Sequence, residues 1–259
     1  MTNFSEFPSL PAQGAVRQTA TPQPVWRRPL PASGFGDRLL LRGLAALAEQ
    51  QVIAISGVYH VDPLHDPMII AINHSTRSEA VLVPALLMVH RGGRIVHFLA
   101  DWNFRLIPGV GLLYRRAQTI SVMRKPARPK ALTILKPLYA HPLSALQQAR
   151  RKLEAGHAIG VFPEGTVNRD PQMLLPGRRG AAYLSLATGV PVVPVGIRFP
   201  ELMPGRPIPD SARMTVTIGP ALHPPAPRTA RPAPQHIRDW HAAIMTDIGR
   251  LSGKGWRER

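Results

Sequence analysis

The spacing of apolar residues predicts an amphipathic helix near the start of the chain, over residues 36–51. Its leucines recur at helical intervals on one side: Leu40, Leu44 and Leu47. Charged side chains fall on the other side. Two interpretations stay open. The leucines pack against a protein core, or they lie in the acyl region of a membrane with Arg38 and Arg42 at the lipid phosphates.

Short apolar runs then alternate with helical patterns. The run from Met68 to Ile72 is almost uninterrupted, which predicts a strand buried on both faces. Further strand-like segments are 52–58, 94–99, 119–123, 158–162, 192–195 and 214–218. Helical patterns cover 79–90, 142–155, 179–188 and 235–251. This alternation predicts an α/β domain with a mixed, largely parallel sheet flanked by helices.

Composition divides the chain into four parts. Residues 1–35 are rich in Pro, Gln, Thr and Ser, which predicts a disordered tail. The amphipathic, membrane-associating helix follows over 36–51, and the α/β domain covers 52–222. Residues 223–259 combine a proline-rich linker with a terminal helix.

The charge of the chain predicts an anionic partner. The sequence has 32 Lys and Arg against 15 Asp and Glu, a formal net charge of +17. Aromatic residues are only 6% of the chain, and we find no zinc-finger spacing or RNA-recognition signature. An anionic membrane fits as well as nucleic acid, because each basic residue near acidic lipid contributes about 1 kcal/mol. Charge alone does not decide between them.

The chain has no cysteine, which excludes disulfides, thiolate catalysis and cysteine-ligated metals and permits a reducing compartment. The longest apolar runs fall short of the roughly 18 residues that a membrane span requires. The first residues also lack the apolar core of a signal peptide. We therefore expect a soluble or monotopic protein.

The candidate chemistry begins in the segment Asn73 to Glu79. His74 follows the buried strand, and Glu79 is five positions later, so the two side chains can meet on successive turns of a helix. A carboxylate that binds one ring nitrogen fixes the tautomer, and the other nitrogen can then accept a proton from an alcohol. This spacing alone is weak, because a chain with ten histidines contains such pairs by chance.

A second cluster, Phe162 to Thr166, is more specific. It follows a strand that Pro163 ends, and Gly165 permits a tight bend. Glu164 and Thr166 are left as polar groups at the rim of the predicted sheet. The simpler reading is a strand-terminating turn in which the threonine caps the backbone.

Four segments in this order resemble the glycerolipid acyltransferase family, whose best-known members are the 1-acylglycerol-3-phosphate acyltransferases. They are Asn73–Glu79, Ile107–Arg124, Phe162–Thr166 and Val190–Val195. Together they span most of residues 52–200. The resemblance implies the acyltransferase fold.

The resemblance also implies roles for individual residues. In this family the histidine deprotonates the acceptor hydroxyl, which attacks the thioester of acyl-CoA or acyl carrier protein, and the acid orients the ring. Those catalytic roles fall on His74 and Glu79. Residues that resemble the acceptor-binding groups for phosphate and glycerol are Arg124, Glu164, Gly165 and Thr166.

Three departures from the family pattern affect these expectations. Glu79 stands where most members have Asp, and Val167 stands where they have an arginine. Two explanations stay open: Arg169 substitutes for that arginine, or the acceptor has no phosphate at this position. Asp101 stands where a basic residue is common. Residues that would restore the positive charge are Arg115, Arg116, Arg178 and Arg179.

The resemblance implies an O-acyltransferase at the cytoplasmic face of a membrane, peripheral or monotopic. Its donor is acyl-CoA or acyl carrier protein, and its expected acceptor is 1-acylglycerol-3-phosphate, with another lyso-lipid or hydrophobic alcohol as the alternative. No metal, cofactor or nucleic acid is expected. A catalytically inactive protein of this fold that binds membranes or nucleic acid stays the alternative of a different class. A serine hydrolase is excluded, because no Gly-x-Ser-x-Gly elbow occurs.

Overall fold

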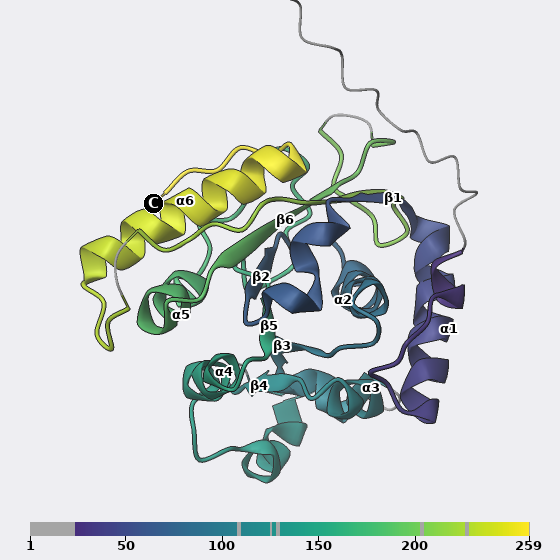
Figure 1. Ribbon diagram of the computed structural model, residues 1–259, viewed down its shortest axis with the longest axis horizontal. Helices are drawn as coiled ribbons and strands as arrows, with labels where there is room; N and C mark the ends of the chain where they lie inside the picture. Colours follow the sequence, from purple (N-terminus) through teal and green to yellow (C-terminus); the bar gives the residue numbers. More distant parts are fainter. Residues whose placement is uncertain are drawn as a thin grey trace, which may run out of the picture.

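The computed structural model describes residues 24–107, 110–124, 126–127, 130–202, 205–225 and 228–258. A seven-stranded sheet runs through the middle of the molecule, with helices on both sides (Figure 1). The strands are β1 Val52–Ser56, β2 Ile69–Ile72, β3 Val96–Asp101, β4 Ile120–Val122, β5 Ala158–Val161, β6 Val192–Arg198 and β7 Met214–Ile218.

The strands lie in the order β1-β7-β6-β2-β5-β3-β4. All neighbours are parallel except β6 and β7, so β1 and β7 run opposite to the other five strands. The predicted mixed, largely parallel sheet is confirmed. The short strand β2 lies between β5 and β6, which places its carboxyl end at the centre of the sheet.

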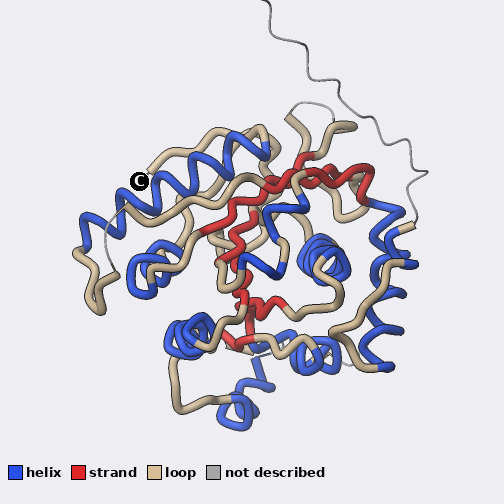
Figure 2. The backbone as a smooth tube through the Cα atoms, in the orientation of Figure 1, coloured by secondary structure: helices blue, strands red, loops and turns tan. Residues whose placement is uncertain are grey.

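The helices form a layer on each face of the sheet (Figure 2). They are α1 Phe35–Gln51, α2 Glu79–His90, α3 Val110–Arg116, α4 Ala145–Glu154, α5 Gly180–Thr188 and α6 Pro234–Ser252. Short 3-10 helices are η1 Val25–Arg27, η2 Val58–Val61, η3 Pro63–His65, η4 Trp102–Leu106 and η5 Lys130–Tyr139. Within the described residues, every helix is too short or too polar to cross a bilayer.

Strand β2 divides the hydrophobic core into two halves. Ile70 and Ile72 pack with α1 and α2, whereas Ile69 and Ala71 pack with α4, α5 and α6. Successive side chains of a strand point to opposite faces, so an all-apolar strand contributes to both halves. Burying each isoleucine contributes about 1.5–3 kcal/mol. This explains why the run in the sequence shows no alternation.

The segment before α1 departs from the predicted tail. Residues 1–23 and 259 lie outside the described residues, but residues 24–34 pack against the domain. Leu30 and Ser33 are buried, and Ser33 Oγ donates to the Gly93 carbonyl at 3.1 Å. The prediction of disorder was therefore wrong for residues 24–34. Their composition is polar on average, but Leu30 packs in the hydrophobic core and holds the segment.

Helix α1 has its buried stripe one position later than the leucine spacing indicated. Leu41, Ala45 and Ala48 are buried against α2. The two small alanines allow the helices to approach closely. Leu47, which the spacing placed on the apolar side, is exposed.

The C-terminal helix belongs to the same core as the sheet. Helix α6 packs on β6 and α5, with Trp240 and Ile244 among its buried side chains. The segment after it runs beside residues 172–176. There the Leu174 amide donates to the Gly255 carbonyl at 2.8 Å, and the Gly255 amide donates to the Gln172 carbonyl at 2.7 Å.

Candidate active site

The two motif clusters meet at the carboxyl ends of adjacent parallel strands. Asn73 and His74 follow β2, and Phe162 follows β5, its neighbour in the sheet. Open α/β sheets bind ligands at this edge, beyond the carboxyl ends of the strands. The fold therefore brings together residues about 90 positions apart, as the His74 amide and Glu164 carboxylate show.

The asparagine before the histidine anchors the loop to a third strand. Asn73 Nδ2 donates to the Ile197 carbonyl at 3.2 Å, and the Ile197 amide donates to Asn73 Oδ1 at 2.7 Å. The amide side chain thus continues the hydrogen bonding between β2 and β6 by one position. Sequence reasoning missed this role, although a buried asparagine directly after a strand is a signal of it. The position of His74 is fixed as a result.

His74 and Glu79 form the predicted pair. His74 Nδ1 lies 2.9 Å from Glu79 Oε1, and the Ser75 amide donates to the same oxygen. A carboxylate oxygen accepts, so Nδ1 carries the proton and Nε2 keeps its lone pair. The Glu79 side chain is fully buried, whereas that of His74 is 15% exposed and lines a cavity. The ring is therefore oriented and open on one side.

The predicted geometry of this pair was wrong in one respect. His74 lies in the loop between β2 and the helix, and Glu79 is the first residue of α2. The chain between them bends back so that both side chains meet without a helical turn. At the helix N-terminus the carboxylate also faces the positive end of the helix dipole, which stabilises its charge.

Glu164 joins the two clusters through the backbone. Its Oε1 accepts from the His74 amide at 2.9 Å, and its Oε2 accepts from Asn168 Nδ2 at 2.7 Å and the Leu175 amide at 2.9 Å. Burial raises the pKa of this carboxyl, while these hydrogen bonds and the charge of Lys254 oppose that rise. The predicted acceptor-binding carboxylate thus already has protein donors on both oxygens.

The rest of this cluster faces the cavity. Gly165 and Thr166 line it. Gly165 has a φ of 67°, and a Cβ there would lie 2.5 Å from Arg178 Nε. The left-handed conformation favours glycine here, and the missing side chain leaves room for Arg178.

A row of aromatic rings supports the histidine. The ring of Phe162 lies 4.6 Å from that of His74 and 5.6 Å from that of Phe98, between centroids. Phe98 lies over Gly160 of β5, where a Cβ would approach the phenyl ring to 2.4 Å. The glycine in β5 thus makes room for the ring packing next to His74.

A cavity of about 1790 Å³ opens beside His74. It is larger than the ~300–1,000 Å³ of ordinary small-molecule sites. Leu40 and Leu44 of α1 and Met88 of α2 form part of an apolar wall. The remaining wall includes basic side chains, among them Arg77, Arg116, Arg124, Arg169, Arg178 and Arg179.

Several of these arginines already have carboxylate partners. They are Arg169 with Asp210 at 2.7 Å, Arg116 with Asp37 at 2.9 Å, and Arg179 with Glu258 at 3.1 Å. Arg124 and Arg178 are exposed and form no ion pair with a carboxylate among the described residues. Asp101 accepts from the Asn103 amide at 3.0 Å, and so caps η4.

Two positions of the resemblance, Pro108 and Gly109, lie outside the described residues. Of the predicted site residues, the structure brings His74 and Glu79 into contact and places Gly165, Thr166, Arg124 and Arg169 in the wall of the same cavity. Glu164 lies behind that wall. A buried lysine, Lys254, also reaches this loop and was not anticipated from the sequence.

Comparisons with known proteins found similarity to one family and to solved structures. A family model described as acyltransferase matches residues 52–198. A similar solved structure is the 1-acyl-sn-glycerophosphate (LPA) acyltransferase PlsC from Thermotoga maritima, with a TM-score of 0.55 and 19% identity over 85% of this chain and 83% of that chain. At this identity the likeness shows the fold. No curated protein matches the sequence.

Proposed function

The chain belongs to the acyltransferase family, and from this premise we propose that it moves a fatty acyl group from a thioester to a lysophospholipid hydroxyl. The donor is acyl-CoA or acyl carrier protein, and the first acceptor to test is 1-acylglycerol-3-phosphate. The observation that carries the proposal is the His74 ring, held by Glu79 on one side and facing a large cavity on the other.

The proposed reaction uses His74 as general base. Nε2 takes the proton of the acceptor hydroxyl as its oxygen attacks the thioester carbonyl. The tetrahedral intermediate collapses, the carbon–sulfur bond breaks, and the imidazolium returns the proton to the leaving thiolate. Glu79 stabilises the imidazolium between these steps. The protein itself forms no covalent intermediate.

The acyl chain is assigned to the apolar part of the cavity. Leu40, Leu44 and Met88 line a wall contributed by two helices. Burying hydrocarbon there is favourable by about 0.8 kcal/mol for each CH₂ group. The cavity volume suits a long chain together with a headgroup.

The acceptor phosphate is assigned to Arg178 and Arg124. Arg169 was the candidate substitute for the arginine missing at Val167, but its guanidinium is paired with Asp210 at 2.7 Å. Arg178 instead packs over Gly165 and lines the cavity. A guanidinium binds phosphate through two parallel hydrogen bonds, so an arginine without a carboxylate partner is the better ligand.

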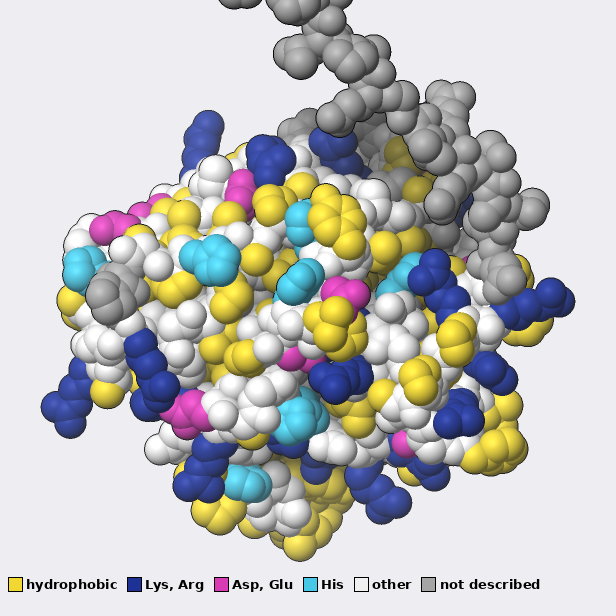
Figure 3. All heavy atoms as spheres, viewed as in Figure 1, with side chains coloured by type: hydrophobic (Ala, Val, Ile, Leu, Met, Phe, Trp, Pro, Cys, Tyr) yellow, Lys and Arg dark blue, Asp and Glu magenta, His cyan; other side chains and the backbone are white. Residues whose placement is uncertain are grey.

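An anionic membrane surface is the proposed site of action. Large apolar side chains stand out near the cavity, including Phe35, which is 86% exposed, and Ile134, which is 82% exposed. Apolar side chains gather at the lower end of the view in Figure 3, where η5 lies, with Lys and Arg side chains around them. Apolar groups surrounded by cations suit insertion between acidic headgroups.

The test is an assay of the purified protein with acyl-CoA and a panel of lysolipids. We expect turnover by the wild type and a loss of about 10²–10⁴-fold for His74→Ala, the contribution of a general base. His236→Ala changes an exposed histidine of α6 and serves as the control. Equal turnover by the wild type and His74→Ala would overturn the mechanism.

A further inference from the structure

Lys254 is a buried cation that the proposed chemistry does not use. It is only 6% exposed and lies two positions after the end of α6, beyond Gly253. The ammonium donates to Ser75 Oγ at 2.8 Å and to the Asp170 carbonyl at 2.7 Å. Ser75 is the residue after His74. The lysine therefore contacts the loop of residues 73–78, which we call the catalytic loop. Buried lysines are rare unless they are paired.

The charges around Lys254 come from three parts of the chain. Glu79 comes from α2, Glu164 from the loop after β5, and Asp170 from the loop that follows it. Burial lowers the pKa of Lys254, and these three carboxylates oppose that shift. Glu79 and Glu164 are themselves buried. One ammonium thus lies among the two carboxylates that hold the side chain and the backbone of His74.

Glu79 has a particular need for this charge. Its Oε1 accepts from the Ser75 amide and faces His74, but its Oε2 is buried with no hydrogen-bond partner among the described residues. A buried carboxylate with one oxygen unsatisfied is costly to ionise. A nearby cation offsets that cost without occupying the oxygen.

The backbone fixes the position of the lysine. Gly253 ends α6 with a φ of 70°, and the Lys254 amide donates to the Gly249 carbonyl at 3.0 Å. After the lysine, Gly255 pairs with Gln172 and Leu174, and Trp256 Nε1 donates to the Pro176 carbonyl at 3.2 Å. The ammonium is therefore aimed at the loop by a turn and by the short ladder that follows it.

We propose that Lys254 is a positioning residue for acyl transfer: it holds the catalytic loop through Ser75 and places a positive charge beside the buried carboxylates of Glu79 and Glu164. The inference rests on the proposed function, because it assigns Lys254 to the same base, His74. It acts through the pair and does not touch the substrate; the cavity lining beside His74 does not include it.

The charge of Lys254 predicts the sign of a pH effect. A nearby cation lowers the pKa of a carboxyl, so removing Lys254 lets burial raise the pKa of Glu164 further. A neutral carboxyl is a weaker acceptor than a carboxylate, so a protonated Glu164 holds the His74 amide less firmly. This change moves the acid limb of the activity profile to higher pH.

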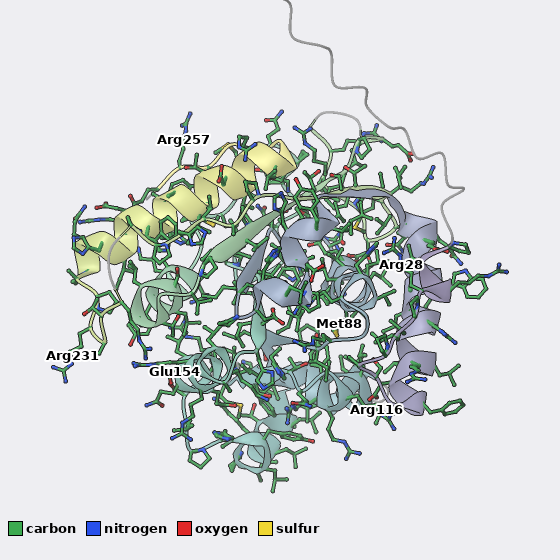
Figure 4. The ribbon with its side chains drawn as sticks, in the orientation of Figure 1. Arg28, Met88, Arg116, Glu154, Arg231 and Arg257 are labelled. Atoms are coloured by element: carbon green, nitrogen blue, oxygen red, sulfur yellow. The ribbon has the colours of Figure 1, made fainter. Side chains whose placement is uncertain are left out.

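The experiment compares Lys254→Met, Lys254→Arg and Arg257→Met in the full chain. Arg257 is an exposed cation three positions later that points out from the surface (Figure 4), so its variant is the matched control. We measure kcat, KM and the pH profile of kcat/KM with acyl-CoA and the best lysolipid. Lys254→Met is expected to lower kcat about 10–100-fold with little change in KM, and to move the acid limb up by about half a unit to one unit.

Lys254→Arg is expected to restore the pH profile and part of kcat, and Arg257→Met to match the wild type. A Lys254→Met enzyme with an unshifted acid limb would overturn the proposal, whether or not its kcat falls. If that variant does not fold, as judged by thermal unfolding, Ser75→Ala removes the same contact from the loop side. A kcat of Ser75→Ala equal to that of the wild type would then overturn the proposal. Absence of acyl transfer by the wild type is a separate result, which refutes the proposed function.

Discussion

The inner and outer parts of the cavity differ in how their polar groups are held. Inside, His74, Glu79 and Glu164 are fixed by hydrogen bonds to backbone amides and to each other. At the rim, Arg124 and Arg178 project from loops as exposed side chains. The inner groups are held in place by these hydrogen bonds, whereas long, exposed side chains such as arginine can adopt several rotamers.

This difference separates chemistry from recognition. Proton transfer requires an oriented ring, and orientation comes from anchors on β2, β5 and β6. Binding of a phosphate headgroup, as proposed above, requires positive charge near the phosphate, which a few long side chains supply from several positions. Under this proposal, we expect a different acceptor to require changes at the rim first.

The sharpest test of the inner part is Glu79→Gln. The glutamine amide keeps the shape of the Glu79 side chain but removes the charge that stabilises the imidazolium. We therefore expect kcat to fall about 10²–10³-fold with KM nearly unchanged. Steady-state kinetics measure both parameters. Glu154→Gln, which alters an exposed glutamate of α4, is the control. A fall confined to KM would place Glu79 in substrate binding instead.

The outer part is tested by Arg178→Gln beside Arg169→Gln. Losing hydrogen bonds to a charged phosphate costs about 1.5–3 kcal/mol, so Arg178→Gln is expected to raise KM for a phosphate acceptor about 10–100-fold. Arg169→Gln should change KM about 3-fold or less, since its guanidinium is engaged by Asp210 and such exposed pairs contribute little. A larger rise in KM for Arg169→Gln than for Arg178→Gln would assign the phosphate to Arg169 instead.

The smallest expected effect concerns the surface beyond the rim. Replacing Phe35 and Leu39 of α1, which are 86% and 68% exposed, by Glu removes apolar contacts and adds negative charge. We expect about 10-fold weaker binding to anionic vesicles at low salt, with unchanged thermal unfolding. Vesicle co-sedimentation measures it, and Leu64→Glu, an exposed residue of η3, is the control. Equal loss in both variants would point to net charge alone.

The sequence predicts the inner part well because its signals are local. The run from Met68 to Ile72 marks a strand buried on both faces, and the residues that follow it carry the histidine and its acid. The path of the loop between His74 and Glu79 could not be predicted from spacing, because its bend depends on the hydrogen bond from the Ser75 amide to Glu79. The direction of β7, antiparallel to β6, likewise has no signature in its own residues.

Other features depend on contacts that spacing cannot reveal. The role of Glu164 depends on the His74 and Leu175 amides, which donate to its carboxylate from distant parts of the chain. The stripe of α1 shifted because Ala45 and Ala48, which look unremarkable in a hydrophobic pattern, allow closer packing on α2 than leucine does. Helix α3 and η5 were also missed, since their short sequences lack a clear period.

The contact between Lys254 and Ser75 joins residues 179 positions apart. Chain segments so distant meet late in folding, because the entropy of closing a long loop must be overcome before the contact contributes. The neighbouring α1 and α2, by contrast, pair over a short stretch of chain. A refolding protein should thus regain its helices and much of its compactness first, and its catalytic competence last, when the segment after α6 docks against the loop beneath His74.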